Sequence, residues 1–341
     1  MKNKAAWLRT VISLFLCGSI FLFCEYYFLF SEKNKSANFL EKNNQSIPLS
    51  QIEKTNTKSK IQENTELEKA VETGTKGTVL GGIKEKFISP YSAPQNYKKV
   101  YLKNNTDCPI NIADFLNGEL PFKLDKTDDY QVLIIHTHAT ETYMKSNSDT
   151  YTSDFSSRTR DNEYNMVKMG EIITEKLNKA GIKTLHDKTQ HDYPEYNGSY
   201  SRAANTICSY LEKYKSIKIV LDIHRDAVGD NDGNKIKLVT EIEGKKAAQV
   251  MIVMGSNTGS VTNFPNWQEN LKLAVKLQQT LESEYPTLAR PLSLMSKNYN
   301  ESLTTGSLLV EIGTDGNTVE EAKYSSELVG KSLVKLFKKL K

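Results

Sequence analysis

Histidine and carboxylate side chains lie within or just after three apolar runs that are typical of buried strands. His138 follows one continuous run of apolar residues, and His224 follows another. Glu311 lies inside a third apolar run, where a carboxylate without a partner would be costly. In an open α/β sheet, ligands bind beyond the carboxyl ends of the strands. The residue types and their placement therefore indicate a site at one edge of a sheet.

Two neutral imidazoles and a carboxylate, with one position left open, form the ligand set of a catalytic zinc ion. We expect His138, Glu141 and His224 to bind zinc. Glu311 would lie outside the coordination shell, take a proton from the bound water and pass it to the leaving nitrogen. Asp222 is two residues from His224 on the same strand face, so we expect it to hold that histidine in place.

Alternatives stay open at two of these positions. His136 competes with His138, and either Asp161 or Glu163 competes with Glu141 as the acidic ligand. Both of these carboxylates also suit the start of a helix. A single histidine at a strand end is more often structural, so a non-catalytic scaffold competes with a zinc hydrolase.

The elements that must position these residues alternate between strand and helix. Buried strands are expected over 131–136, 217–223, 249–254 and 307–312, and helices over 163–180, 201–214, 270–284 and 320–340. A short strand over 100–102 and a short helix over 112–116 precede them. This order predicts an α/β fold with a mostly parallel central sheet flanked by helices. No GxGxxG or GxxxxGK[ST] motif is present, which argues against a nucleotide site.

Residues 1–30 are expected to form a cytoplasmic N-terminus and a transmembrane anchor. The run from Thr10 to Phe30 is 21 residues long, and at ~1.5 Å per residue it covers about 30 Å, the thickness of a bilayer core. Lys2, Lys4 and Arg9 precede it, which places the rest of the chain on the extracytoplasmic side. A cleaved secretory signal and a buried helix are the alternatives, but no small-residue cleavage site follows the run.

The rest of the chain divides into three parts. Residues 31–78 are rich in Lys, Asn, Glu, Ser and Thr and predict a flexible polar linker. Residues 79–129 form a lead-in subregion packed on the catalytic domain, which covers 130–341. With 45 basic and 41 acidic residues, the charge balance argues against a nucleic-acid binder. The sequence leaves open whether Cys108 and Cys208 form a disulfide.

Several ordered motifs resemble one family. They are Thr137–Tyr143 (THATETY), Asp222–Ala227 (DIHRDA), Leu309–Gly313 (LVEIG) and Asn317-Thr318. From about residue 97 to 341 the chain resembles stage II sporulation protein P, a family of membrane-anchored cell-wall hydrolases of endospore-forming bacteria.

The resemblance implies a zinc-dependent N-acetylmuramoyl-L-alanine amidase with a fold similar to the cell-separation amidases. It also implies endopeptidase activity on peptide cross-links of peptidoglycan, in septal wall remodelling and forespore engulfment. The implied partners are stage II sporulation protein D, a lytic transglycosylase, and stage II sporulation protein M, a polytopic membrane protein. His138, His224 and Glu311 match the metal histidines and the glutamate of the family, and Glu141 is the more consistent match for the acidic ligand.

Two further roles are hypotheses about the substrate. Arg225 is expected to bind a carboxylate of the peptide stem, because a guanidinium matches a carboxylate with two hydrogen bonds. Tyr143, Tyr193 and Tyr200 would offer ring faces to sugars, with ordinary packing as the alternative. Competing functions are another zinc hydrolase, such as a peptidase or an esterase, and a wall-binding scaffold.

Overall fold

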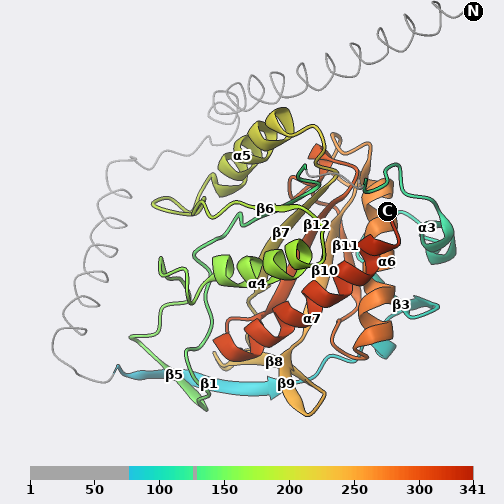
Figure 1. Ribbon diagram of the computed structural model, residues 1–341. Coiled ribbons are helices and arrows are strands. Elements are labelled where there is room, and N and C mark those ends of the chain that lie inside the picture. Colours follow the sequence, from blue (N-terminus) through green and yellow to red (C-terminus); the bar gives the residue numbers. More distant parts are fainter. Residues whose placement is uncertain (1–76, 126–128, 341) are drawn as a thin grey trace, which may run out of the picture. The chain divides into compact units, whose positions relative to one another are not determined.

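The strands that carry the predicted site lie side by side in an eight-stranded sheet. The computed structural model describes residues 77–125 and 129–340 (Figure 1). The order in the sheet is β2-β3-β11-β10-β12-β7-β4-β6. Its strands are Gln95–Tyr97 (β2), Val100–Asn104 (β3), Val132–Ile135 (β4), Thr184–His186 (β6), Ile219–Asp226 (β7), Val250–Gly255 (β10), Leu292–Met295 (β11) and Ser307–Thr314 (β12). β12 is the last of these strands in the sequence, yet it lies between β7 and β10.

The sheet is mixed. β12, β7, β4 and β6 are parallel to one another, as are β3, β11 and β10. β10 is antiparallel to β12, and β2 is antiparallel to β3. Parallel strands need a long crossover connection, which is usually a helix. The chain between β7 and β10 contains no helix, and β10 runs in the direction opposite to β7. The predicted α/β class is confirmed. A mostly parallel sheet was predicted, but the sheet consists of two groups of opposite direction, because β3, β11 and β10 run antiparallel to β12, β7, β4 and β6.

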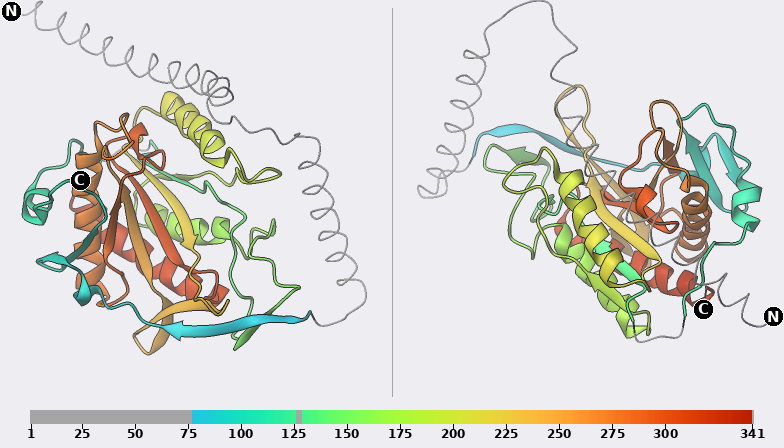
Figure 2. Two further views of the ribbon diagram at one scale, coloured as in Figure 1. Left: turned by 180° about the vertical axis from the view of Figure 1, so that it is seen from behind. Right: turned by 90° about the horizontal axis from the view of Figure 1, so that it is seen from above.

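Helices cover both faces of this sheet. They are Ile112–Asn117 (α3), Met166–Lys179 (α4), Ser199–Lys213 (α5), Trp267–Glu284 (α6) and Val319–Lys338 (α7), with 3₁₀ turns at Pro90–Ser92 (η1) and Glu301–Leu303 (η2). Figure 2 shows helices on the two sides of the sheet. Leu221 and Val310 pack in the cluster that α4, α6 and α7 cover, and Leu133 packs with Ile207 of α5. Because both faces are covered, the central strands are apolar on both sides.

A second sheet of four strands was not predicted. It has the order β5-β1-β8-β9, with strands at Val79–Lys86 (β1), Thr150–Thr152 (β5), Lys235–Ile242 (β8) and Lys245–Ala248 (β9). β1 contains two glycines and three exposed charged residues, a composition of low strand propensity. Its strand form comes from tertiary pairing, in which Ile83 lies opposite Lys235 of the parallel strand β8.

The predicted anchor and nearly all of the predicted linker lie outside the described residues. Among the helices that the structure describes, none combines the length and apolar character needed to cross a bilayer. Cys108 and Cys208 are thiols and form no disulfide with each other.

Gly170 of α4 makes room for a pair of histidines. His136 Nε2 and His186 Nε2 are 2.8 Å apart in a hydrogen bond, and the other ring nitrogen of His136 is 3.0 Å from the carbonyl oxygen of Ile223. A Cβ atom at Gly170 would lie 2.5 Å from the His136 ring and 2.8 Å from His186 Nε2. The hydrogen bonds leave the rings little freedom to move away.

We expect Gly170→Ala to lower the unfolding free energy by about 1 kcal/mol. Overpacking typically costs about 1–3 kcal/mol, and the gain of about 1 kcal/mol in helix propensity offsets part of that cost. Chemical denaturation of the variant measures this change. Glu175→Ala, at an exposed position of the same helix, is the control and should change stability by less than about 0.5 kcal/mol. An unchanged midpoint for Gly170→Ala would contradict the crowding argument.

Candidate functional site

The site lies at the carboxyl ends of β4, β7 and β12. In the parallel pair of β7 and β12, Glu311 is directly opposite His224, and Leu309 is opposite Asp222. Residues two apart on a strand point to the same face, so Asp222, His224 and Glu311 share one face of the sheet. The sequence motifs therefore meet in one row across two strands.

The segment after β4 brings His138 and Glu141 to this row. The amide N–H of Glu141 donates to the carbonyl oxygen of His138 over 3.1 Å, which folds the segment into a turn. The rings of His138 and His224 are 5.2 Å apart between centroids and nearly perpendicular, at 83°. Glu141 Oε2 lies 3.8 Å from His224 Nδ1. All three predicted zinc ligands are buried and adjacent.

Asp222 holds His224 from behind. Its Oδ1 atom lies 2.9 Å from His224 Nε2, and it accepts two hydrogen bonds from Thr137, from the amide at 2.9 Å and from the hydroxyl at 2.6 Å. Burial would raise the pKa of Asp222, but His224 and Thr137 outweigh burial and lower it to about 2. Burial would lower the pKa of His224, but the carboxylates of Asp222 and Glu141 raise it to about 9.

Burial is the largest influence on the pKa values of the other titratable groups at the site. It lowers the pKa of His138 to about 4 and raises the pKa of Glu141. It also raises the pKa of Glu311 to about 8, because the attraction of His224 only partly compensates for the lost hydration. A carboxyl group that exchanges its proton near neutral pH is suited to both accepting and donating one.

The donor set fits a zinc ion. His138 Nδ1 and Glu311 Oε2 are buried without a hydrogen-bond partner. Two ligand atoms of one tetrahedral zinc ion lie roughly 3.3 Å apart, close to the 3.8 Å between Glu141 and His224. Within residues 77–125 and 129–340, no group of three or more His, Cys, Asp or Glu side chains is close enough to hold a metal ion without rearrangement. Small side-chain movements would therefore accompany binding.

The competing carboxylates lie apart from this row. Asp161 is exposed and accepts a hydrogen bond from the amide of Glu163 over 3.0 Å. Glu163 is also exposed and forms an ion pair with Lys168 at 3.0 Å. Of the three carboxylates that the sequence left open, the structure brings Glu141 to His224.

The competing histidine also has other contacts. His136 uses both ring nitrogens, with Ile223 and His186, on the side of the sheet that faces α4. His191 is buried and contacts the carbonyl oxygen of His136 and the hydroxyl of Thr206, each at 3.0 Å. These three histidines have structural contacts.

Arg225 is buried and contacts the main chain. Its guanidinium donates to the carbonyl oxygens of Thr142, Ser157 and Asp226 over 2.9, 2.7 and 3.3 Å. Its amide N–H donates to Glu141 over 3.4 Å. These bonds hold the segment that carries Glu141, and the role of Arg225 in substrate binding stays a prediction.

The three tyrosines differ in exposure. Tyr143 is 1% exposed and donates to the carbonyl oxygen of Ile312, so the interpretation of its ring as a sugar contact is wrong. Tyr200 is half-buried, and its ring centroid is 5.5 Å from that of His138. Tyr193 is 47% exposed.

Sequence reasoning missed two residues of the site. The ring of Tyr196 stacks on His138 at 4.8 Å, and its hydroxyl is 3.3 Å from His138 Nε2. Arg158 lies over the Tyr196 ring at 4.7 Å, contacts Glu141 at 3.5 Å and forms an ion pair with Asp192. Both come from irregular segments with no periodic pattern, and no spacing rule marks them.

Comparison with known proteins identifies the family to which the chain belongs. The sequence profile described as Stage II sporulation protein P (SpoIIP) matches residues 21–333. A curated relative, Stage II sporulation protein P of Bacillus subtilis (strain 168), is 28% identical over 219 residues, which are 60% of this chain and 51% of the relative. The chain thus spans about half the length of the curated relative that it matches.

Solved structures of amidases are more distant. The apo form of an N-acetylmuramyl-L-alanine amidase from Mycobacterium abscessus is 13% identical, with a TM-score of 0.35 over 63% of this chain and 99% of that one. An N-acetylmuramoyl-L-alanine amidase from Clostridium difficile 630 is 17% identical, with a TM-score of 0.34 over 62% and 97% of the two chains.

Proposed function

Since this chain belongs to the stage II sporulation protein P family, we propose that it is a zinc-dependent amidase of peptidoglycan that acts in sporulation. The proposed reaction cleaves the amide between N-acetylmuramic acid and the L-alanine of the stem peptide. The observation that carries the proposal is the meeting of His138, Glu141, His224 and Glu311 at one edge of the sheet.

Zinc would be held by His138, Glu141 and His224. When bound, the ion acts as a Lewis acid that polarises the amide carbonyl and acidifies water. The surrounding residues of the chain orient the ligands. Asp222 fixes the His224 ring, while Arg158 and the amide of Arg225 hold the Glu141 carboxylate.

Proton transfer is assigned to Glu311. Amide hydrolysis needs a base that removes a proton from the attacking water and an acid that protonates the leaving nitrogen. The pKa of Glu311, raised by burial to about 8, suits both steps. Tyr196 and Tyr200 cover His138 from two sides and limit the access of bulk water to the site.

Other parts of the proposal depend on the family alone. They are cleavage of peptide cross-links, action in septal wall remodelling and forespore engulfment, and partnership with stage II sporulation proteins D and M. An extracytoplasmic, membrane-anchored location is supported by the apolar run from Thr10 to Phe30.

The proposal is tested by digesting purified peptidoglycan with the full chain, with and without a chelator. Mass spectrometry of the products should show stem peptides with free L-alanine amino termini, and the chelator should abolish their release. Release of other ends would indicate a different hydrolase. Wall binding without any cleavage, also after addition of a lytic transglycosylase, would favour a scaffold.

A further inference from the structure

Two irregular segments form a wall beside the site. Residues 156–165 follow β5, and residues 187–198 follow β6. The side-chain amide of Gln190 donates to the carbonyl oxygen of Arg160 and to Asn162, each over 2.9 Å, and Arg158 forms an ion pair with Asp192. These contacts join the two segments.

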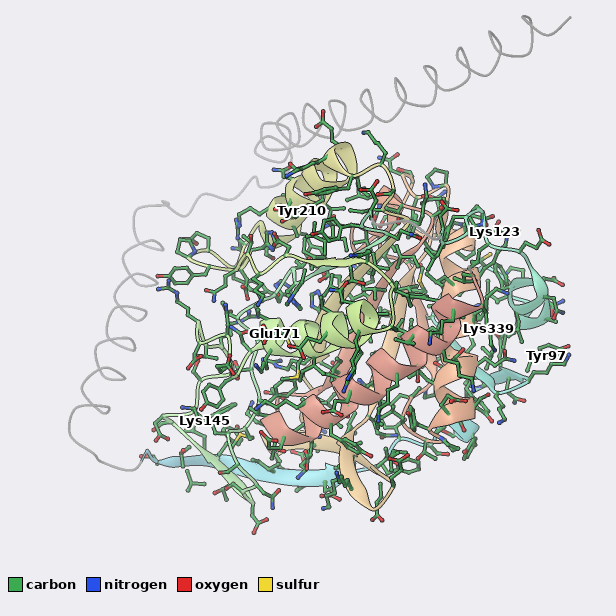
Figure 3. All side chains as sticks on the ribbon, viewed as in Figure 1. Tyr97, Lys123, Lys145, Glu171, Tyr210 and Lys339 are labelled. Atoms are coloured by element: carbon green, nitrogen blue, oxygen red, sulfur yellow. The ribbon has the colours of Figure 1, made fainter. Side chains whose placement is uncertain are left out.

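The second segment is also tied to the helices on both faces of the sheet. Lys188 forms an ion pair with Glu171 of α4 at 2.7 Å, and the hydroxyl of Tyr210 on α5 donates to Asp187 over 3.0 Å. Figure 3 labels Glu171 and Tyr210 on their helices. The wall is therefore a fixed surface beside His138.

Cations lie over tyrosine rings along this wall. Arg160 is 4.1 Å from the ring centroid of Tyr193, and Arg158 is 4.7 Å from that of Tyr196. The two arginines differ in their charge partners. Arg158 already contacts Asp192 and Glu141, whereas Arg160 is exposed and, in the part of the chain that the structure describes, forms no ion pair with a carboxylate.

An arginine stacked on an aromatic ring keeps its N–H edge directed outward. Its planar fork matches a carboxylate with two charge-assisted hydrogen bonds, and the stacking reduces the freedom that binding would remove. Arg160 is two residues from Arg158, so their Cα atoms are at most about 7 Å apart. The backbone of Arg160 is therefore close to that of Arg158, which contacts the proposed ligand Glu141.

We propose that Arg160 and Tyr193 form a subsite for a carboxylate of the substrate's peptide. This inference rests on the proposed function and places the peptide part of the substrate along the wall. It also assigns to Arg160 the contact that the sequence suggested for Arg225, whose guanidinium contacts carbonyl oxygens of the main chain instead.

The test compares two muramyl peptides, one with free carboxylates and one with those groups converted to amides. For the full chain carrying Arg160→Gln, KM for the free acid should rise about ten- to a hundredfold, the usual range for lost hydrogen bonds to a charged group. The value of kcat should change little, and KM for the amidated peptide should stay within about twofold of the wild-type value.

Lys145→Gln is the matched control. Lys145 is a second exposed cation over a tyrosine ring, 5.3 Å from the Tyr164 centroid, and its removal changes the net charge equally. An equal effect of the two variants, or equal losses on both peptides, would overturn the subsite.

Calorimetric binding of both peptides to the zinc-free chain separates the subsite from the chemistry. If wild-type protein cleaves neither peptide but prefers the free acid, and Arg160→Gln removes that preference, the proposed amidase fails and the subsite stands. If both proteins cleave the peptides and neither prefers the free acid, the proposed amidase stands and the subsite fails.

Discussion

Glu311→Gln is expected to slow peptidoglycan cleavage by about 10²–10⁴-fold while wall binding is retained. Glutamine keeps the size and the polarity of the side chain but neither accepts nor delivers a proton. Because Glu311 lies outside the three ligands, zinc content should stay at the wild-type level. The measurements are the rate of stem-peptide release, a wall pull-down and metal analysis of the same preparation.

Glu301→Gln provides a matched control. Glu301 is also a buried carboxyl group beside β12, where its two oxygens accept from the amides of Gly255 and Leu309 at 2.6 and 3.2 Å. Burial raises its pKa well above the usual value. Glutamine keeps one of the two acceptor oxygens and turns the other position into an N–H donor, so the folding of this variant is checked by thermal unfolding before its cleavage rate is compared. Its cleavage rate should stay within a fewfold of wild type. A Glu311→Gln protein that is as active as this control would remove Glu311 from the mechanism.

His224→Ala is expected to lose both zinc and measurable cleavage. The variant removes a ligand and leaves Asp222 as a buried carboxylate without its cationic partner. Removing the metal from wild-type protein with a chelator should have the same effect on activity, and added zinc should restore it only in the wild type. Metal analysis and the cleavage assay measure the two losses.

Zinc binding to wild-type protein should also depend on pH. The pKa of the metal-free His224 is raised to about 9, so below that pH the histidine carries a proton that must leave when zinc binds. Affinity should therefore rise with pH up to about 9. Calorimetry in two buffers of different ionisation enthalpy measures the released proton.

His186→Gln is the control for the loss of a histidine. His186 bonds to His136 on the other side of the sheet, so its replacement should leave zinc content unchanged. Full zinc content in His224→Ala, or pH-independent affinity, would exclude His224 as a ligand.

Much of the site could be predicted because its residues follow buried strands. The apolar runs of β4, β7 and β12 are strong local signals, and the parallel arrangement places their carboxyl ends together. The pattern alone indicates His224 and Glu311, but it leaves His136 open beside His138 and leaves three carboxylates open as the acidic ligand. The choice of His138 and Glu141 depends on the motifs of the family that the chain resembles.

The missed parts depend on contacts between distant segments. β1 has low strand propensity and takes its form from β8. Arg158 and Tyr196 reach the site from irregular segments, where the position of a side chain follows from cross-links such as Arg158–Asp192. No local pattern encodes those contacts.

The central position of β12 has a consequence for biosynthesis. β7 and β10, which pair with β12 on its two sides, are synthesised before it. β12 itself carries Glu311. A nascent chain that has not yet made β12 has two unpaired strand edges on β7 and β10, which favour aggregation. Such a chain also lacks the proton-transfer residue of the proposed reaction. If the proposed function holds, hydrolytic competence depends on the strand that is made last, and incomplete or proteolysed chains that lack it would leave the wall intact.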